Sequence, residues 1–550
     1  SRSQTSECIV NCRNVKSAIV NLYTHKNDGD LGISTDHFIN GGDDLSVHIA
    51  LLFSCINVHG YVPSDFSAST IIPIPKKSNA DTSSSDNFRG IALSSVFCKI
   101  FDNVILHKFQ DKLNSCDLQF GFKRKSSTHM CTMVLKETLA YYNSNQTSVF
   151  CTFLDASKAF DRINYCKLFR FLLERKLPAV VIRVLISLYT GHMVRVSWAG
   201  FASDYFKALN GVKQGGIISP VLFCVYIDQL LINLASSGVG CYVGLNFVGA
   251  LAYADDIVLL APTPTAMRKL LSICDIYALK YDIIFNATKS KFLVVIPGIR
   301  RSLQNILSGI VFYVGGSVIE YVESYVHLGH IITSKITDEE DILQRRNCFV
   351  GQVNNVLCFF RKLDMFTKIK LFKSFCTSFF GCELWALDDR AIDEFCISWR
   401  KSVRRVLDIP YNSHSFSLPV LSDTLPIFDE ICKRSARFIV SCLFCPSRLV
   451  NSIVWYGVLL GRYNSVVGRN ALICCDRYGW EQTDFVMGSI NLSKQFFTMH
   501  CDSKLTQSDK STIVSTFEML CVREGLFSLT NSMLLSRPEI QKLLSVVTCN

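Results

Sequence analysis

Apolar and polar residues alternate along this chain in two periods, one typical of helices and the other of strands. Apolar side chains at helical spacing predict helices over residues 44–59, 95–113, 128–142 and 266–281. Short apolar runs bounded by turn residues predict extended segments at 70–75, 88–93, 149–154, 283–286 and 291–296. The pattern therefore predicts a mixed region of helices and strands up to about residue 330.

The flanks of that region have different patterns. Residues 1–40 are polar and interrupted by turn residues, which predicts a linker ahead of the first helix. From residue 331 onward the pattern is mainly helical and carries basic pairs such as Arg404-Arg405. Residues 211–220, here called the glycine turn, precede a predicted helix that ends near Ala235. The backbone amides at such a helix start favour an anion.

The most specific local pattern is Tyr253-Ala254-Asp255-Asp256, which lies between two apolar runs. Two strands joined this tightly place both aspartates at one end of a sheet. Asp155 directly follows the strand predicted at 149–154 and adds a third acid. Adjacent carboxylates repel each other without a cation, and Mg²⁺ prefers oxygen ligands. The pattern favours a metal site, although an Asp-Asp turn also serves solubility and local hydrogen bonding.

Composition limits the classes of function without choosing one. The 550 residues are enough for about three or four domain-sized units. A membrane span is not expected, because charges interrupt every apolar stretch of about 18 residues, although mean hydropathy is +0.26. The net charge of +11 permits a nucleic-acid partner without requiring one. The chain opens at Ser1 without methionine, and we expect it to be a piece of a longer protein.

Cysteine usage indicates packing rather than bridges or metal sites. The 24 cysteines are scattered through apolar segments, which predicts buried thiols in a reducing compartment. Cys442 and Cys445 have zinc-finger spacing, with His500-Cys501 far downstream. That arrangement lacks the second compact half of a zinc finger, so we expect no zinc site there.

Three acids, a glycine turn and a lone lysine occur in an order that suits two-metal phosphoryl transfer. Asp155 comes first, then Gln214-Gly215 in the glycine turn, then Asp255-Asp256, then Lys289. Three carboxylates can hold two ions, of which one activates an attacking hydroxyl and the other neutralises a triphosphate and its leaving pyrophosphate. The long separation between Asp155 and Asp255 is no obstacle if their strands lie side by side.

Ten short blocks occur along the chain in this order: YVPSDF, IIPIPKK, NFRGIAL, QFGFKRKSST, FLDASKAFDRI, GVKQGGIISPVLF, YADDIVLL, NATKSK, HLG and CELWAL. Each block alone is weak, but together they resemble the reverse transcriptases of non-LTR retrotransposons, the LINE-type and jockey-like elements. The resemblance extends from about Val58 to about Leu387 and implies an RNA-directed DNA polymerase.

The resemblance implies an α+β fold of the right-hand polymerase type. That fold has fingers, a palm built on an antiparallel sheet plus helices, and a helical thumb, followed here by a mainly helical C-terminal region. The implied domains are an N-terminal extension with a linker and a helix at 1–57, fingers at 58–148, a palm with interleaved fingers elements at 149–330, a thumb at 331–411 and a helical region of unknown role at 412–550. Within the last region, residues 433–438 favour a helix packed on the thumb over a nucleic-acid contact.

The resemblance also implies catalytic roles for single residues. Asp155, Asp255 and Asp256 match the acids that bind two Mg²⁺ ions, with Mn²⁺ as an alternative, and Asp256 is the least certain direct ligand. Lys289 matches the residue proposed to protonate the departing pyrophosphate. The turn 327–329 matches the one that grips the primer.

Five further positions match the nucleotide-binding residues of the family. Phe160 matches the residue beneath the incoming sugar, where an aromatic ring clashes with a 2′-hydroxyl and favours deoxynucleotides. Lys76 and Arg89 match fingers cations that grip the triphosphate, for which arginine offers bidentate contact. Gln214 and Gly215 match the turn that packs against the nascent base pair.

Simpler readings and two departures from the family pattern stay open. Phe160 also fits a core position, Lys289 a solvated loop, and Lys76 an edge-strand position that discourages aggregation. Gly90 stands where the family usually has proline, and Gly216 where it usually has serine. Both glycines loosen the backbone near substrate, so we expect lower fidelity or activity without loss of chemistry.

The leading hypothesis is a retrotransposon reverse transcriptase that copies its element's RNA from the 3′-hydroxyl of a DNA primer at a nicked target. Its partners are then an RNA template, a DNA primer and deoxynucleoside triphosphates, without a membrane, in the cytoplasm and nucleus. One alternative is a catalytically lapsed copy that only binds RNA. Another is a viral RNA-dependent RNA polymerase, which Phe160 and the Tyr-Ala-Asp-Asp form disfavour. Target choice and oligomeric state are not readable from the sequence.

Overall fold

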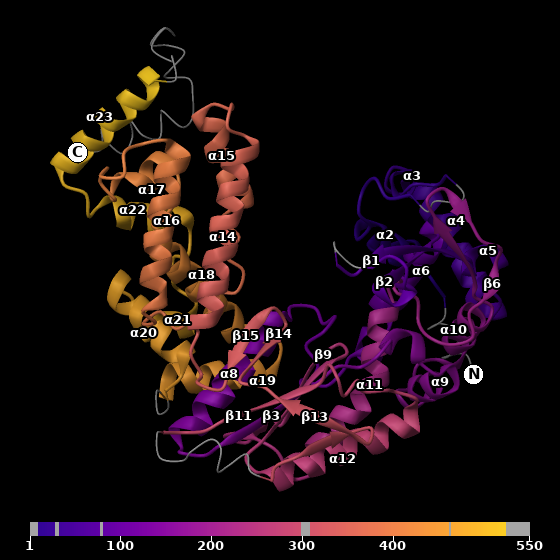
Figure 1. Cartoon of the computed structure of the whole chain (residues 1–550). Helices are drawn as coiled ribbons and strands as arrows, with labels where there is room; N and C mark the ends of the chain where they lie inside the picture. The colour runs from indigo at the N-terminus through magenta and orange to yellow at the C-terminus, as the bar shows by residue number, and fades with distance from the viewer. Residues whose placement is uncertain (1–8, 28–31, 78–80, 299–308, 461–463, 524–550) are drawn as a thin grey trace.

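The computed structural model describes residues 9–27, 32–77, 81–298, 309–460 and 464–523. In Figure 1 the chain forms a U, with a sheet and its helices at the base and one arm rising at each end. The first arm contains the N-terminal elements together with α9 (Tyr165–Glu174) and α10 (Ala179–Thr190). The second arm contains the helices from α14 (Glu339–Phe359) onward.

The base of the U is a six-stranded sheet in the order β12-β13-β11-β3-β10-β9. Its strands are β3 (Val149–Leu154), β9 (Ala250–Tyr253), β10 (Asp256–Ala261), β11 (Lys291–Val295), β12 (Phe312–Val314) and β13 (Ser317–Tyr321). All neighbours pair antiparallel except β11 and β13, which run parallel. Three helices pack against these strands, namely α8 (Thr128–Ser144), α11 (Ser219–Ala235) and α12 (Pro264–Tyr281). The predicted palm, an antiparallel sheet with helices, is thus confirmed.

A second sheet lies in the first arm. Its strands are β1 (Ser69–Pro75), β2 (Phe88–Ser94), β4 (Met193–Trp198), β5 (Phe201–Ala202) and β6 (Phe206–Lys207). β1 pairs antiparallel with β2 and parallel with β4, so a strand from beyond residue 190 completes a sheet begun before residue 95. This crossover explains why elements of the two regions are interleaved in the sequence.

The polar N-terminal stretch is not a linker where the structure describes it. It contains α2 (Cys12–Val20) and α3 (Thr35–Ile39), which pack against α4 (Gly42–His59). α2 also packs against α6 (Val96–Lys108). The buried positions of α2 are Val15, Ala18 and Ile19. The linker prediction for residues 1–40 is therefore wrong in these two helices, because three apolar residues at helical spacing were enough to anchor a short helix among polar ones.

Two further predictions need correction. The helix predicted over 95–113 is divided into α6 and α7 (Gln110–Leu113), because Phe109 between them has a non-helical φ of −123°. The segment 283–286 is not a strand, although Phe285 forms an isolated bridge with Ala156, just after β3.

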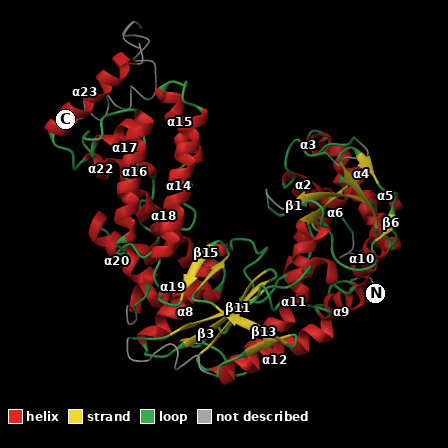
Figure 2. Cartoon of the chain, in the orientation of Figure 1, coloured by secondary structure: helices red, strands yellow, loops and turns green. Residues whose placement is uncertain are grey.

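Short elements complete the first arm and the base: α5 (Ser64–Ser67), η1 (Ser85–Asn87), η2 (Ala159–Arg162), β7 (Tyr242–Val243) and β8 (Asn246–Phe247). The hairpin of β14 (Ser324–His327) and β15 (His330–Thr333) stands where the second arm begins. Beyond it, the elements that the structure describes are all helices, joined by loops (Figure 2). They are α14, α15 (Met365–Phe375), η3 (Cys382–Leu384), α16 (Ala391–Leu407), α17 (Ser417–Ser422), α18 (Ile427–Leu443), α19 (Arg448–Trp455), η4 (Tyr456–Leu460), α20 (Val466–Tyr478), α21 (Gln482–Met487), α22 (Lys494–Asp502) and α23 (Gln507–Arg523).

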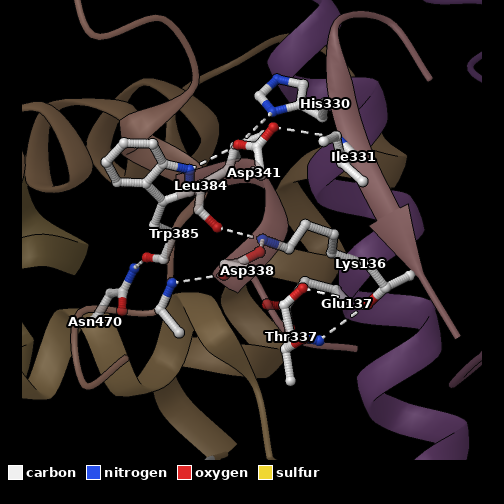
Figure 3. Close-up of polar contacts among 12 residues, drawn as sticks. Lys136, Glu137, His330, Ile331, Thr337, Asp338, Asp341, Leu384, Trp385 and Asn470 are labelled. Atoms are coloured by element: carbon white, nitrogen blue, oxygen red, sulfur yellow. Dashed lines mark hydrogen bonds and ion pairs between the residues drawn. The ribbon is translucent and has the colours of Figure 1, made fainter. Parts of the chain in front are cut away.

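A buried polar network fastens the second arm to α8 of the base (Figure 3). We call it the arm junction and define it by Lys136, Asp338, Asp341, Trp385 and Asn470. Lys136 Nζ lies 2.6 Å from Asp338 Oδ1, and Trp385 Nε1 donates to Asp341 Oδ2 at 2.8 Å. Asn470 Nδ2 donates to Trp385 O at 2.7 Å, which brings α20 into the same network. The C-terminal helices are therefore built into the fold.

Two expectations concern the whole chain. Among the helices that the structure describes, none is both long and apolar enough to cross a membrane. The cysteines that the structure describes are free thiols, and most are buried as the sequence predicted, but the prediction is wrong for the exposed Cys55, Cys166, Cys348 and Cys358.

Candidate active site

Strand pairing brings the three predicted acids to one end of the palm sheet. β3 and β10 pair antiparallel with Leu154 opposite Ile257, so Asp155 and Asp256 follow at the same end. Asp255 lies in the two-residue turn that joins β9 to β10. The long separation in sequence is thus closed by direct pairing of the two strands. We call these three residues the acid cluster.

The carboxylates of the acid cluster disfavour one another's ionisation. Burial, and then the charges of Asp255 and Asp155, raise the pKa of Asp256 to about 6. Burial also raises the pKa of Asp255, to which the Asp155 charge adds, while the cations Arg89 and Lys289 oppose the rise. Asp256 is exposed at the surface, so solvent screens part of this repulsion. A cation placed here would relieve it.

The donor chemistry of the acid cluster fits a divalent cation. Asp155 Oδ2 is buried and accepts no hydrogen bond, which is unusual for a carboxylate oxygen. The Lys289 Nζ lies 3.6 Å from this oxygen, on a side chain that is 65% exposed. Within the described ranges, no three His, Cys, Asp or Glu side chains converge closely enough to hold a metal ion. The oxygens suit Mg²⁺, and sharing an ion requires the three carboxylates to draw closer.

A tight loop after α12 holds Lys289 beside Asp155. Asn286 N donates to Asp155 O at 2.8 Å, and Asp155 N donates to Ser290 Oγ at 3.2 Å. Asn286 Oδ1 accepts from Thr288 N at 3.0 Å and from Lys289 N at 3.2 Å, which closes the loop on itself. The block NATKSK therefore forms a loop that is hydrogen-bonded to the backbone of Asp155, and its lysine lies beside the Asp155 carboxylate.

Phe160 lies half-buried on the loop after β3, with its ring held between two other aromatic rings. It stacks on Phe223 of α11 at 4.9 Å between centroids, and Phe122 meets it edge-on at 6.5 Å. Phe160 O accepts from Val212 N at 2.9 Å, which ties this loop to the glycine turn. The Phe160 ring is therefore positioned by aromatic packing, on the segment that directly follows Asp155.

The glycine turn packs against β2 of the first arm. Gln214 is half-buried, and its carbonyl oxygen accepts from Ala92 N at 2.7 Å. Gly215 has a φ of +107°, and a Cβ there would lie 2.9 Å from Ala92 O, so glycine is required. At the end of the turn, Asp102 Oδ2 accepts from Ile218 N at 3.3 Å. The anion expected at this helix start is thus the protein's own carboxylate, which the sequence reasoning missed.

The two predicted fingers cations lie near the tip of the β1–β2 hairpin. Arg89 pairs across the strands with Ile74 and is exposed, and its charge acts on Asp255 as described above. Lys76 is also exposed, and its Nζ donates to Asp86 O at 2.7 Å. The structure therefore brings Arg89 within the field of the acid cluster, whereas Lys76 is held by the loop between the two strands.

The turn 327–329 joins β14 to β15, with Leu328 and Gly329 in left-handed conformations. The His327 ring is buried against Phe153 at 5.2 Å, and burial lowers its pKa to about 3. The imidazole is therefore neutral, and what the turn presents outward is backbone. A role in gripping a primer stays a prediction.

At the two glycines that depart from the family pattern, a larger residue would crowd a neighbouring side chain, but the backbone conformation does not require glycine. Neither Gly90 nor Gly216 has a positive φ. A Cβ on Gly216 would lie 2.7 Å from Ser219 Oγ, and one on Gly90 would lie 3.0 Å from Ile71 Cγ2. The predicted effect of both glycines on fidelity or activity stays a prediction.

Three comparisons relate this geometry to known proteins. Residues 74–332 match the family described as reverse transcriptase (RNA-dependent DNA polymerase). The chain is 29% identical over 264 residues to the retrovirus-related Pol polyprotein from type-2 retrotransposable element R2DM of Drosophila melanogaster, covering 47% of this chain and 24% of that protein. It is 22% identical over 392 residues to the RNA-directed DNA polymerase from mobile element jockey of the same fly, covering 67% of this chain and 41% of that protein. The chain thus spans less than half the length of these relatives.

Among solved structures, apo telomerase from Candida tropicalis is 15% identical to this chain, with a TM-score of 0.38. That match covers 79% of this chain and 69% of the telomerase chain. The same enzyme in complex with a fragment of telomeric RNA is 12% identical, with a TM-score of 0.37, and covers 74% of this chain and 68% of that one.

Proposed function

Because residues 74–332 form a reverse transcriptase domain of the non-LTR retrotransposon type, we propose that the chain copies RNA into DNA by extending a DNA 3′-hydroxyl. The observation that carries the proposal is the acid cluster, three carboxylates gathered by strand pairing at one end of the palm sheet. The raised pKa values of Asp255 and Asp256, and the buried Asp155 Oδ2 that accepts no hydrogen bond, suit a site for divalent cations.

The acid cluster is proposed to hold two Mg²⁺ ions, for which Mn²⁺ can substitute. Bound there, the ions would supply activation of the primer hydroxyl and neutralisation of the phosphate charge. Asp155 and Asp255 are the better placed ligands, because Asp256 is the more exposed residue at the first position of β10. The side chains of the protein then have to bind, orient and protonate the substrate.

Three basic side chains are proposed to bind or protonate the phosphate groups of the nucleotide. Arg89 and Lys76 bind its oxygens from the exposed face of the β1–β2 hairpin, where a guanidinium makes paired hydrogen bonds. Lys289 protonates the leaving pyrophosphate from its Nζ, which the loop 286–290 keeps beside the acid cluster. The long, exposed side chain of Lys289 can turn from Asp155 to a bound phosphate without any movement of the backbone.

Phe160 and the glycine turn are proposed to select the nucleotide. The Phe160 ring stacks on Phe223 and meets Phe122 edge-on, and in this position it would clash with a 2′-hydroxyl, so deoxynucleotides are preferred. Gln214 and Gly215 form the surface for the nascent base pair, and the hydrogen bond from Ala92 fixes that surface to the first arm. Selection of sugar and base thus depends on parts that packing has made rigid.

The proposal extends to partners and to the division of the chain. The template is the RNA of the element itself, the primer is the 3′ end of a nicked target DNA, and the two form an A-form duplex during synthesis. The fingers are residues 58–148, the palm 149–330 and the thumb 331–411, with the helices beyond them buttressing the thumb. The proposed setting for this reaction is inside the cell, in the cytoplasm and nucleus.

Primer extension tests the proposal directly. The chain is incubated with an RNA template, an annealed DNA primer, deoxynucleoside triphosphates and Mg²⁺, and the products are sized by electrophoresis. Extension is expected for wild type and for the control Asp44→Ala, an exposed aspartate in the first turn of α4, and not for Asp255→Ala. Binding of RNA without any incorporation, unchanged by Asp255→Ala, would instead indicate a lapsed copy that only binds RNA.

A second arm of the same assay tests the choice of sugar. Deoxynucleotides are expected to be incorporated in preference to ribonucleotides, and Phe160→Val is expected to narrow that preference. Preferred incorporation of ribonucleotides by the wild-type chain would point to an RNA-making polymerase. Phe169→Val, a buried phenylalanine of α9, serves as a control for the packing defect alone.

A further inference from the structure

A short segment before α8 runs alongside the strand that leads into the acid cluster. Ala252 N donates to Leu118 O at 2.9 Å, and Phe120 N donates to Ala252 O at 2.8 Å. Gln119 therefore forms a parallel bridge with Ala252 of β9. The segment continues the palm sheet beyond β9 and stops at the level of the turn that carries Asp255.

The Gln119 side chain binds that turn through its amide group. Its Oε1 accepts from Ala254 N at 2.9 Å and from Gly121 N at 2.8 Å, and its Nε2 lies 3.4 Å from Ala254 O. Gln119 is only 1% exposed, so no water competes for these bonds. One buried amide thus contacts both the N–H and the C=O of the residue before Asp255.

The turn needs such a restraint because Ala254 has a left-handed backbone. Its φ is +58°, a conformation that a side chain with a Cβ disfavours and that glycine adopts readily. No glycine stands at Ala254, so bonds from outside the turn have to hold this conformation. Gly121 lets the segment come close enough to supply them, because a Cβ there would lie 2.4 Å from Ala254 N.

We propose that Gln119 is a positioning residue that fixes the Ala254 peptide and thereby the direction of the Asp255 carboxylate. The inference rests on the proposed function for its catalytic consequence, whereas the restraint itself is a property of the fold. Gln119 does not touch substrate or metal. Its effect passes through Ala254, which is bonded directly to Asp255.

The same segment also reaches the ring proposed to select the sugar. Phe122 follows Gly121, has a φ of +54° and meets Phe160 edge-on at 6.5 Å. A shift of the segment would therefore move one support of Phe160 together with the turn of Asp255. Loss of the Gln119 bonds is expected to affect both the rate and the choice of sugar.

The competing interpretation is a buried amide that contributes only stability, and Asn470 offers a matched control for it. Asn470 is 2% exposed and likewise makes three bonds, to Leu387 N, Trp385 O and Ser435 Oγ. It lies in the arm junction and contacts no residue of the acid cluster. Gln119→Leu and Asn470→Leu therefore remove equivalent buried bonds from the two places.

The first measurement is the exchange of backbone amides in metal-free protein, followed by mass spectrometry of the peptide that covers residues 251–257. Gln119→Leu is expected to speed exchange in this peptide at least tenfold, because the Ala254 amide loses its acceptor. Asn470→Leu is expected to leave it unchanged. Unaltered protection of this peptide in Gln119→Leu would overturn the restraint.

The second measurement is primer extension with Mg²⁺ titrated at saturating and at limiting deoxynucleotide. Gln119→Leu is expected to lower kcat about tenfold and to raise the Mg²⁺ concentration for half-maximal rate several-fold, while KM and binding of the primed template change less than twofold. Gln119→Glu is expected to recover part of the rate, because it keeps an acceptor oxygen in the same place. Asn470→Leu is expected to lower the melting temperature and leave kcat unchanged at 25 °C.

The outcomes separate this inference from the proposed function. Equal losses of kcat in Gln119→Leu and Asn470→Leu would mean that Gln119 acts only through stability, and would overturn the positioning role. A wild-type chain that extends no primer would overturn the proposed function alone. In that case the affinity for Mn²⁺, measured by electron paramagnetic resonance, serves as the readout in place of the extension rate. Weaker binding in Gln119→Leu than in Asn470→Leu supports the inference, and equal binding overturns it.

Discussion

The arm junction and the acid cluster both hold aspartates against the palm, but their surroundings act on those charges in opposite directions. In the arm junction, Asp338 accepts from Lys136 Nζ at 2.6 Å and from Ala386 N at 2.9 Å. In the acid cluster, Asp155 Oδ2 accepts no hydrogen bond although it is buried. Burial and the Asp155 charge disfavour the ionised form of Asp255 more than Arg89 and Lys289 favour it, whereas Asp338 is paired directly with a lysine.

The pKa values record the same contrast. Burial alone would raise the pKa of Asp341 in the arm junction, but the contact from His330 and the hydrogen bonds from Trp385 and Ile331 together lower it. Burial raises the pKa of Asp256, and the neighbouring acids add to the rise. Carboxylates with hydrogen-bond donors or a cation beside them stabilise a fold. Carboxylates without such partners are tolerated where a bound ligand is to supply the positive charge.

The largest expected effect comes from removing a charge of the acid cluster. Asp255→Asn is expected to lower the rate of primer extension by at least ~10³-fold, because several kcal/mol of metal-borne stabilisation are lost. The same change is expected to leave the free energy of unfolding unaltered or to increase it, because repulsion among the carboxylates falls. Primer extension and urea unfolding measure the two effects on one preparation.

A stability loss in Asp255→Asn as large as its loss of rate would break the comparison, because it would show the acid cluster to be structural. Asp275→Asn serves as the control. Asp275 accepts from Gly315 N at 2.9 Å outside the acid cluster, so its replacement is expected to change stability slightly and the rate not at all.

The next largest effect is expected in the arm junction, where removing a charge is expected to lower stability and leave the rate nearly unchanged. Asp338→Asn is expected to lower the free energy of unfolding by about 3 kcal/mol, because the Lys136 ammonium is only 13% exposed and loses its counter-charge. The rate of primer extension at 25 °C is expected to stay within twofold of wild type. Urea unfolding followed by tryptophan fluorescence measures the first quantity. A strong loss of rate with intact stability would place Asp338 in the catalytic machinery.

A smaller effect is expected from removing a single hydrogen bond, with a neutral donor, from the same network. Trp385→Phe removes the indole donor to Asp341 Oδ2 and keeps most of the buried ring, which is 1% exposed. We expect the free energy of unfolding to fall by about 1–2 kcal/mol, because a buried acceptor oxygen loses its hydrogen bond. Trp198→Phe, at a side chain that is 48% exposed, is the control and is expected to change stability by less than about 0.5 kcal/mol.

The sequence predicted the acid cluster better than the arm junction, for a physical reason. Asp255 stands between apolar runs long enough to specify two strands, and the strands alone bring it to Asp155. Asp338 and Asp341 lie in an acidic run at the start of α14, where charges usually face solvent and favour the helix dipole. The partner of buried Asp338 is Lys136, 202 residues away, and that of buried Asp341 is the Trp385 indole, 44 residues away.

The residues that sequence reasoning missed share this dependence on distant partners. Gln119 and Asp102 are polar residues within otherwise apolar surroundings, which a periodic pattern reads as interruptions. Their partners, Ala254 and Ile218, are more than a hundred residues away. The helix α2 was missed for a different reason, because its buried stripe has only three residues and its mean composition is polar.

The smallest effect expected is a difference in how acidity acts on the two groups of acids. The pKa of Asp256 is raised from 3.8 to about 6 in the folded chain, so between these values the folded state binds more protons than the unfolded state. The contribution of Asp256 to metal-free stability is therefore present below about pH 4 and is lost as the pH rises through 6. The pKa of Asp341 is lowered, so its contribution is present above pH 3.8 and is lost as the pH falls further.

Melting temperatures in EDTA between pH 3 and pH 8 separate these two cases. Asp256→Asn is expected to melt progressively higher than wild type as the pH rises from 4 to 6, and addition of Mg²⁺ at pH 8 is expected to close the gap by stabilising wild type alone. Asp341→Asn is expected to melt lower than wild type at neutral pH and to approach it below pH 4. Parallel curves for wild type and Asp256→Asn would mean that solvent offsets both the burial of this carboxylate and the repulsion on it, because Asp256 is the most exposed of the three acids. The acid cluster would then need its cation for the reaction and not to offset repulsion among its carboxylates.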